Sequence, residues 1–352
     1  MIEKRIETFI RANEEDEETF QTLMIELFRK QFEENAPYRA FCQEKRKTPR
    51  TVKRWQDIPF VPVDAFKHLT LSRVPVEETV ACFMTSGSTS GQRGKHYHAD
   101  LTIYDASMDE TVRRFVVDRP MRIACLFPRA SELPNSSLAH YLNRIVDQYG
   151  KEGSGYFIDS SGIAFDAFAS FLEEATCDDE PVLLLGATFS YVHLFDHFQE
   201  TTFTLPKGSR VFDTGGYKGQ SETLPEATFY ETLSAQFGVP LESCVNMYGM
   251  SELSTQYYDR GHATSPAVKV GPPWIRTRII DPLTGDDLPY GETGIIVHYD
   301  LANTNAVTAV MTEDVGYAHE DGFVLLGRAE GAEAKGCSLQ LADFLQVTGG
   351  TR

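Results

Sequence analysis

The sequence has no apolar run near the roughly 20 residues needed to span a bilayer, and residues 1–5 lack the apolar segment of a signal peptide. We therefore expect a cytoplasmic protein without membrane insertion. Basic residues are scarce, because 33 Lys and Arg stand against 51 Asp and Glu, giving a net charge of −18. This charge repels nucleic acid and anionic membrane surfaces, so neither is expected as a partner.

Closely paired cysteines are also lacking. The six cysteines show no zinc-site spacing, and a reducing compartment disfavours disulfides. We expect most of them to be small buried side chains, with Cys337 as the exception. His96 and His98 share one face of a predicted strand near Asp100, but without further ligands at metal spacing we expect both histidines to be framework.

The order of apolar patterns predicts an α/β protein. Residues 15–35 have the spacing of an amphipathic helix, and two prolines make residues 57–63 extended. Further on, three apolar runs that end in turns predict buried parallel strands, whose carboxyl ends gather where ligands bind. These runs are residues 122–127, 181–185 and 209–212.

Shorter alternating segments follow from about residue 270, joined by Asp, Pro and Gly turns, and they predict an antiparallel, barrel-like subdomain. They are residues 276–280, 293–299 and 322–326. We expect four segments in all. These are a helical N-terminal part of the main domain (1–75), an α/β nucleotide-binding core (76–268), a β-rich subdomain (269–328) and a short C-terminal tail (329–352).

Residues 85–94, Thr-Ser-Gly-Ser-Thr-Ser-Gly-Gln-Arg-Gly, form a loop suited to a triphosphate. Glycines let the backbone approach an anion, hydroxyl and N–H groups donate to its oxygens, and Arg93 adds a permanent charge. The loop is neither a Walker loop nor a dinucleotide turn, and an ordinary surface connection is the alternative. Its predicted ATP contacts are Thr85, Ser86, Gly87, Ser88 and Thr89.

Three later motifs support the nucleotide interpretation: Asp-Thr-Gly-Gly-Tyr at 213–217, Asn-Met-Tyr-Gly-Met-Ser-Glu at 246–252, and Thr-Glu-Asp-Val-Gly-Tyr at 312–317 followed by Gly327-Arg328. With the loop, and in this order, they resemble the adenylate-forming superfamily of acyl and aryl ligases. The resemblance implies the large N-terminal domain of that superfamily, with α/β sheet layers and a small antiparallel β subdomain.

The resemblance also assigns the adenosine contacts. Gly215, Gly216 and Tyr217 match the segment that lies against adenine, and Tyr248, followed by Gly249, matches the aromatic residue that stacks on it. Taken alone, a Gly-Gly pair is more often a simple turn.

Four charged residues match the phosphate and ribose contacts of the superfamily. Arg93 stands at the usual lysine and keeps its charge, Glu252 matches the acid that holds Mg²⁺, and Asp314 matches the ribose-binding acid beside Arg328. ATP and Mg²⁺ are therefore the expected cofactors. Taken singly, these residues would be surface charges or salt-bridge partners.

Typical superfamily members continue past the Gly-Arg pair into a mobile lid with a catalytic lysine, whereas only residues 329–352 follow here. We expect the lid to be absent, and the replacement for its lysine, Lys335 or a partner, stays open. Residues 58–67, 85–91 and 327–338 resemble the acyl-protein synthetases of bacterial luminescence, the LuxE family. This resemblance covers nearly the whole chain.

The family implies that a fatty or related carboxylic acid is activated as acyl-AMP, moved to a cysteine near the C-terminus, and passed to an acyl reductase or another acceptor protein. Cys337 is the matching cysteine. A thiolate attacks an acyl phosphate anhydride readily, and nearby Lys335 would lower the thiol pKa. A cysteine packed in a Gly-Cys-Ser turn is the structural alternative.

Two other functions remain open. One is an aryl-acid adenylating enzyme of phenazine-like antibiotic biosynthesis without self-acylation. The other is a non-catalytic nucleotide- or acyl-binding subunit, which the joint presence of Arg93, Glu252 and Asp314 disfavours. The sequence leaves open the acyl chain length, aliphatic versus aromatic substrate, the final acyl acceptor and the oligomeric state.

Overall fold

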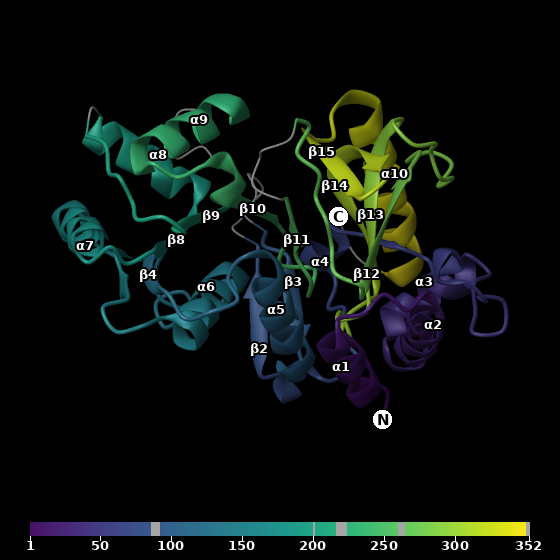
Figure 1. Ribbon diagram of the computed structural model, residues 1–352. Helices are drawn as coiled ribbons and strands as arrows, with labels where there is room; N and C mark the ends of the chain where they lie inside the picture. Colours follow the sequence, from purple (N-terminus) through teal and green to yellow (C-terminus); the bar gives the residue numbers. More distant parts are fainter. Residues whose placement is uncertain (86–91, 200, 216–223, 260–264, 350–352) are drawn as a thin grey trace. The chain divides into compact units, whose positions relative to one another are not determined.

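A computed structural model describes residues 1–85, 92–199, 201–215, 224–259 and 265–349. The chain forms two compact units (Figure 1). Unit 1 contains Met1–Glu110, Met250–Gln256 and Val268–Arg352, and unit 2 contains Thr111–Gly249 and Tyr257–Ala267. The predicted segment 76–268 is thus divided between the units, whereas 1–75 and 269–328 both belong to unit 1.

Unit 1 begins with three helices, α1 (Ile2–Ala12), α2 (Glu17–Glu34) and α3 (Ala36–Glu44). Helix α2 confirms the predicted amphipathic helix. It starts where the Asp16 carboxylate accepts a hydrogen bond from the Thr19 N–H group at 3.0 Å, which satisfies one of the free donors of the first turn. Its apolar stripe is buried in the core of the unit.

The main sheet of unit 1 contains β1 (Val61–Pro62), β12 (Ile275–Ile280), β13 (Thr293–Asp300), β14 (Ala309–His319) and β15 (Gly322–Arg328). The order is β1-β14-β13-β12, and β15 also pairs with β14. The three predicted C-terminal strands are confirmed. The sheet is mixed rather than wholly antiparallel, because β1 joins β14 in parallel.

Smaller elements complete unit 1. These are η1 (Trp55–Asp57), α4 (Ala65–His68), η2 (Val76–Glu78), the hairpin of β2 (Ala81–Met84) and β3 (Lys95–His98), and α10 (Gly331–Thr348). Helix α5 (Thr102–Phe115) runs from unit 1 into unit 2.

Most of the segment predicted as a short C-terminal tail (329–352) is helix α10. Phe344 and Leu345 are buried in the core of unit 1, and the Phe344 ring lies 4.7 Å from the ring of Phe41 on α3. Burial of apolar side chains holds this segment as a helix despite its glycines.

Unit 2 is built on a buried sheet of the order β11-β10-β9-β8-β4-β5. Its strands are β4 (Arg122–Leu126), β5 (Gly155–Tyr156), β8 (Val182–Ala187), β9 (Arg210–Thr214), β10 (Cys244–Tyr248) and β11 (Tyr257–Tyr258). All neighbours are parallel except β11 on β10. The three predicted buried strands are therefore confirmed as β4, β8 and β9.

The remaining elements of unit 2 are α6 (Ser137–Tyr149), α7 (Phe165–Cys177), α8 (Thr188–Phe198), α9 (Glu226–Phe237), η3 (Leu241–Ser243) and the small hairpin of β6 (Ile158–Asp159) and β7 (Gly162–Ile163). None of the helices in the described ranges of the two units has the length and apolarity to span a membrane.

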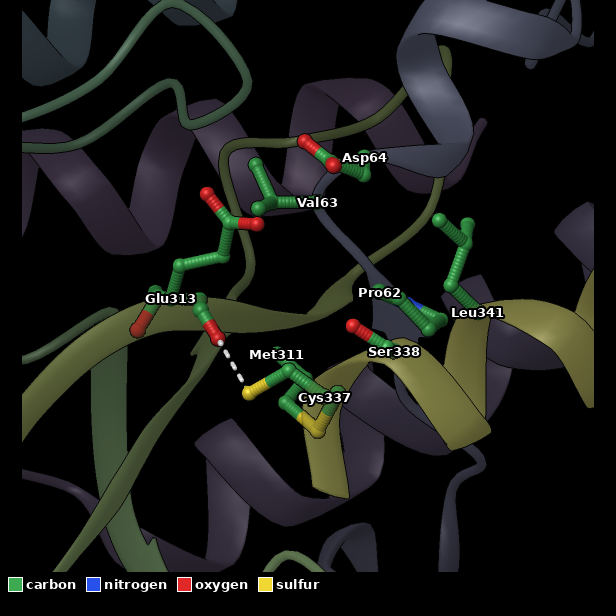
Figure 2. Close-up of a pocket in the computed structure, with 9 residues that line it drawn as sticks. Pro62, Val63, Asp64, Met311, Glu313, Cys337, Ser338 and Leu341 are labelled. Atoms are coloured by element: carbon green, nitrogen blue, oxygen red, sulfur yellow. Dashed lines mark hydrogen bonds between the residues drawn. The ribbon is translucent and has the colours of Figure 1, made fainter. Parts of the chain in front are cut away.

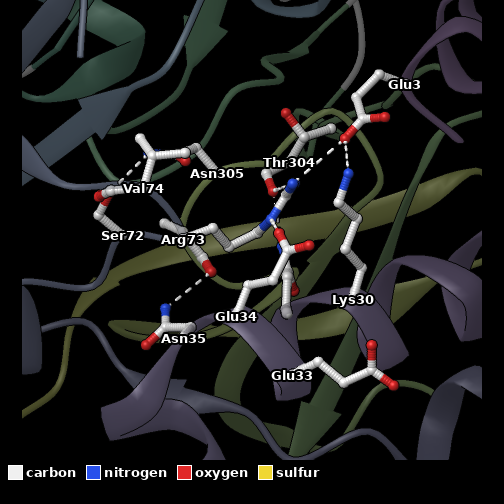
Figure 3. A network of polar contacts seen from close by, with 12 residues as sticks. Glu3, Lys30, Glu33, Glu34, Asn35, Ser72, Arg73, Val74, Thr304 and Asn305 are labelled. Carbon is white, nitrogen blue, oxygen red and sulfur yellow. Dashed lines mark hydrogen bonds and ion pairs between the residues drawn. The ribbon is translucent and has the colours of Figure 1, made fainter. Parts of the chain in front are cut away.

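A polar network joins distant segments of unit 1 (Figure 3). Arg73 donates to Glu34 at 2.8 Å and to the Thr304 carbonyl oxygen at 2.7 Å, and it pairs with Glu3 at 3.3 Å. Lys30 of α2 pairs with the same Glu3 carboxylate. The network therefore connects α1 and α2 to the segment that precedes β14.

Candidate active site

The predicted phosphate loop connects β2 and β3. Its base is closed by two hydrogen bonds, because the Thr85 N–H donates to the Gly94 carbonyl at 3.1 Å and the Gly94 N–H donates to Thr85 Oγ1 at 2.9 Å. Arg93 is exposed, and its guanidinium donates to the carbonyl oxygens of Thr85 and Met84. Four predicted ATP contacts lie outside the described residues: Ser86, Gly87, Ser88 and Thr89.

Glu252, the predicted Mg²⁺ acid, lies next to the end of this loop. Its side chain is only 4% exposed, and a Cβ atom added to Gly94 would lie 2.9 Å from Glu252 Oε1. Glycine at position 94 is therefore what lets the loop approach the carboxylate. Burial raises the pKa of Glu252 to about 7, an effect that the nearby charges of Lys67 and Arg328 only partly oppose.

The predicted ribose contacts are brought together by strand register. Asp314 on β14 lies opposite Arg328 on β15, and Arg328 Nη1 is 3.2 Å from Asp314 Oδ1. The Asp314 N–H donates to Thr312 Oγ1 at 3.0 Å, which fixes the backbone at this position. Arg328 is also 3.7 Å from Glu313 Oε2, so one guanidinium pairs with two carboxylates.

Three further charged residues belong to this site, although no motif predicted a role for them: Asp64, Lys67 and Glu313. Lys67 Nζ lies 2.5 Å from Asp64 Oδ1 on the turn that opens α4. Burial and the Asp64 charge raise the pKa of Glu313. Two features of the sequence could have indicated these residues. Asp64 and Lys67 lie in the family-like segment 58–67, and Glu313 directly precedes Asp314.

We call these residues the charged cluster. Its members all belong to unit 1, and they are four carboxylates and two cations: Asp64, Glu252, Glu313, Asp314, Lys67 and Arg328. The excess of negative charge around a buried carboxylate favours binding of a cation.

Cys337 lies on α10 and is 7% exposed, with its Sγ atom 3.9 Å from the Thr312 carbonyl oxygen. Figure 2 shows the sulfur directed at β14, whereas the Glu313 and Asp64 carboxylates lie on the other side of the same small pocket. The cavity has a volume of about 20 Å³, enough for one water molecule. It is lined by Pro62, Val63, Asp64, Met311, Thr312, Glu313, Cys337, Ser338 and Leu341.

The predicted activation of this thiol by Lys335 is wrong for this conformation. Burial, together with the negative charge of Glu313, raises the pKa of Cys337 to about 11. Lys335 is exposed to solvent, where water and salt screen its charge. At neutral pH the group is a protonated thiol.

The predicted adenosine contacts belong to unit 2. Strands β9 and β10 are parallel neighbours, with Thr214 paired to Met247. Gly215 and Tyr248–Gly249 therefore follow at the same carboxyl edge of the sheet, as the strand pattern predicted. Thr188 Oγ1 donates to the Gly215 carbonyl at 2.9 Å, and Gly215 has a φ of 78°. Gly216 and Tyr217 lie outside the described residues.

Histidine contributes framework beside the charged cluster. His96 Nδ1 lies 2.7 Å from the carbonyl oxygen of Ser251, and burial lowers the pKa of His96 to about 4, so the ring is neutral at pH 7. Among the residues whose placement is described, no group of three or more His, Cys, Asp or Glu side chains is arranged to hold a metal. A single carboxylate such as that of Glu252 is compatible with Mg²⁺, which commonly takes one or two protein carboxylates together with phosphate oxygens.

The family model and the curated relatives indicate the same family. The family model described as "Acyl-protein synthetase, LuxE" matches residues 6–346. The long-chain-fatty-acid–luciferin-component ligase of Aliivibrio fischeri is 23% identical over 355 residues, which covers 95% of this chain and 90% of that protein.

Solved structures share the fold. A 2-hydroxyisobutyryl-CoA ligase in complex with 2-HIB-AMP and CoA matches with a TM-score of 0.60 and 14% identity, covering 88% of this chain and 69% of that one. ATP-bound MatB from Rhodopseudomonas palustris matches with a TM-score of 0.50 and 18% identity, and the chain spans 49% of its length. The predicted adenylate-forming α/β fold is thereby confirmed.

Proposed function

Since this chain belongs to the acyl-protein synthetase (LuxE) family, we propose that it activates a fatty acid with ATP as acyl-AMP, transfers the acyl group to Cys337, and passes it to an acyl reductase or another acceptor protein. The chain is a ligase with the adenylate-forming fold. The observation that carries the proposal is the charged cluster, in which the buried Glu252 carboxylate and the Asp314–Arg328 pair belong to one unit with Cys337.

In the first half-reaction an oxygen of the substrate carboxylate attacks the α-phosphorus of ATP. The new P–O bond forms as the bond between the α-phosphorus and the bridging oxygen breaks, and pyrophosphate leaves. Asp314 accepts hydrogen bonds from the ribose hydroxyls, and Arg328 holds Asp314 in place. The residues at the edge of unit 2, Gly215 and Tyr248, contact the adenine.

Magnesium is expected to bind with ATP at Glu252. A bound Mg²⁺ neutralises part of the triphosphate charge. The contribution of the chain is a carboxylate held next to the phosphate loop by Gly94. Burial raises the pKa of Glu252 because the nearby positive charges do not fully stabilise its ionised form. A bound cation would stabilise the ionised carboxylate further.

In the second half-reaction Cys337 Sγ attacks the acyl carbon. A C–S bond forms, the bond from that carbon to the AMP oxygen breaks, AMP leaves, and the thiol proton passes to solvent. The cavity of about 20 Å³ at the sulfur is too small for an acyl chain. Transfer therefore requires α10 to move away from β14, which also returns the thiol to water.

A second candidate function is aryl-acid adenylation without self-acylation. The burial of Cys337 and the rise of its pKa to about 11 favour it, since both oppose nucleophilic attack. The similarity to a protein named for long-chain fatty acids favours the first function.

The test is carboxylate-dependent ATP–pyrophosphate exchange with a series of fatty and aromatic acids, followed by intact-protein mass spectrometry. We expect exchange with a fatty acid and a hydroxylamine-labile acyl adduct. Cys337→Ser removes the adduct and leaves exchange nearly intact, whereas Cys177→Ser, at an exposed cysteine, changes neither. An undiminished adduct in Cys337→Ser shows that the cysteine is structural, and exchange without any adduct favours the second function.

A further inference from the structure

Lys67 is a half-buried cation beside the predicted phosphate loop. It lies on α4, where the neighbouring Phe66 packs against the end of the loop, since a Cβ added to Gly94 would lie 3.7 Å from Phe66 Cβ. The same Cβ position is 2.9 Å from Glu252 Oε1. Helix α4 and the Mg²⁺-binding carboxylate therefore meet at one residue of the loop.

The surroundings of Lys67 are anionic on two sides. Its ammonium group pairs with Asp64, which lines one small pocket together with Glu313, the residue before Asp314. On the other side, its neighbour Phe66 and the Glu252 carboxylate both lie against Gly94. Lys67 thus lies within electrostatic reach of both ends of the site. In bound ATP, the α-phosphate lies between the ribose and the terminal phosphates.

The other cations at the site are less enclosed. The Arg328 side chain is 68% exposed and pairs with Asp314, and Arg93 is exposed and donates to carbonyl oxygens of its own loop. The Lys67 side chain is only 18% exposed. A charge shielded from water interacts more strongly with a developing negative charge than an exposed one does.

We propose that Lys67 is a catalytic residue of the adenylation step, whose ammonium group contacts an α-phosphate oxygen of ATP and stabilises the negative charge that builds up as the substrate carboxylate attacks. This inference rests on the proposed function. No proton moves to or from Lys67, and the bonds formed and broken are those of the attack on the α-phosphorus. The ammonium has three donors, so Asp64 uses one of them and orients the others.

The experiment measures ATP–pyrophosphate exchange and ATP binding for the wild type, Lys67→Met, Lys67→Arg and a matched control, Lys30→Met. Lys30 is a part-buried lysine with one carboxylate partner, Glu3, in a network apart from the charged cluster (Figure 3). We expect Lys67→Met to lower kcat about 100- to 1000-fold, as removal of a transition-state donor does, with a much smaller change in the KM for ATP. Lys67→Arg recovers part of the rate, and Lys30→Met stays within about twofold of the wild type.

A merely structural role for Lys67 predicts a different pattern, in which Tm and the ATP affinity fall while kcat of the folded protein is retained. That pattern, or wild-type exchange in Lys67→Met, overturns the inference and leaves the proposed function standing. If Lys67→Met does not fold, Lys67→Gln is assayed in its place under the same criteria. A wild type that binds ATP but exchanges with no carboxylic acid overturns the proposed function, and the inference falls with it.

Discussion

Replacing Glu252 by Gln should stabilise the ligand-free protein while it impairs function. The side chain is almost fully buried, and its pKa rises from an ordinary 4.5 to about 7. At about 1.4 kcal/mol per pKa unit, this rise corresponds to about 3 kcal/mol of lost stability once the carboxylate is ionised in both states. Glutamine has the same shape and no charge, so the variant avoids this loss.

The sign of the effect follows from proton linkage. Between pH 4.5 and 7 the folded protein holds the Glu252 proton that the unfolded chain has released, so stability falls as pH rises through this window. Urea unfolding of the wild type and of Glu252→Gln should give nearly equal free energies at pH 4.5. By pH 8 the variant should be more stable by about 3 kcal/mol.

The wild type and Glu252→Gln share all other titrating groups, such as Asp300, whose pKa burial raises to about 6. The contributions of these groups to the free energy of unfolding therefore cancel in the difference between the two proteins. Glu14→Gln, at an exposed acid between α1 and α2, serves as the control for the substitution itself. Pyrophosphate exchange by Glu252→Gln should fall about 100-fold or more. A difference in stability that is the same at pH 4.5 and 8 would refute the assignment of the buried charge to Glu252.

Two further predictions concern the loop and the thiol. Gly94→Ala should reduce pyrophosphate exchange strongly while Tm changes little, because the new methyl group would lie 2.9 Å from Glu252 Oε1 and displace the carboxylate; exchange at the wild-type rate would contradict this placement. Iodoacetamide at pH 8 should modify the exposed Cys177 well before Cys337, whose pKa of about 11 leaves about one thiol in a thousand ionised. Peptide mass spectrometry distinguishes the two sites, and equal labelling would show that α10 does not shield the sulfur.

The strands with continuous apolar runs could be predicted from the sequence because their signal is local. Strands β4 and β8 contain hardly any polar side chains, and both are buried along their whole length. By contrast, β14 could not be recognised in this way, since Glu313 and Asp314 interrupt its apolar pattern. Those two acids belong to the charged cluster, so the feature that hid the strand coincides with the proposed site.

Helix α10 shows a different reason for failure. Gly331 and Gly336 lower its helix propensity, and a Cβ at Gly336 would lie 2.7 Å from Pro282 Cβ, so the glycine there serves close packing. The spacing of Cys337, Leu341, Phe344 and Leu345 was the available helical signal. The motif series singled out Glu252 and Asp314, but the role proposed for Lys67 depends on contacts between α4 and the loop, which a single sequence does not contain.

The pairing of β1 with β14 has a consequence for biosynthesis. Val61 lies beside Val310, so the sheet that carries Asp314 joins residues separated by most of the chain. Residues 111–249 provide nearly all of unit 2, with five of its six sheet strands. During translation unit 2 can therefore begin to fold while unit 1 waits for its C-terminal strands. Until β14 emerges from the ribosome, the apolar faces of the N-terminal helices stay exposed and can aggregate with other chains. A chaperone that covers these faces would therefore contribute most during this interval.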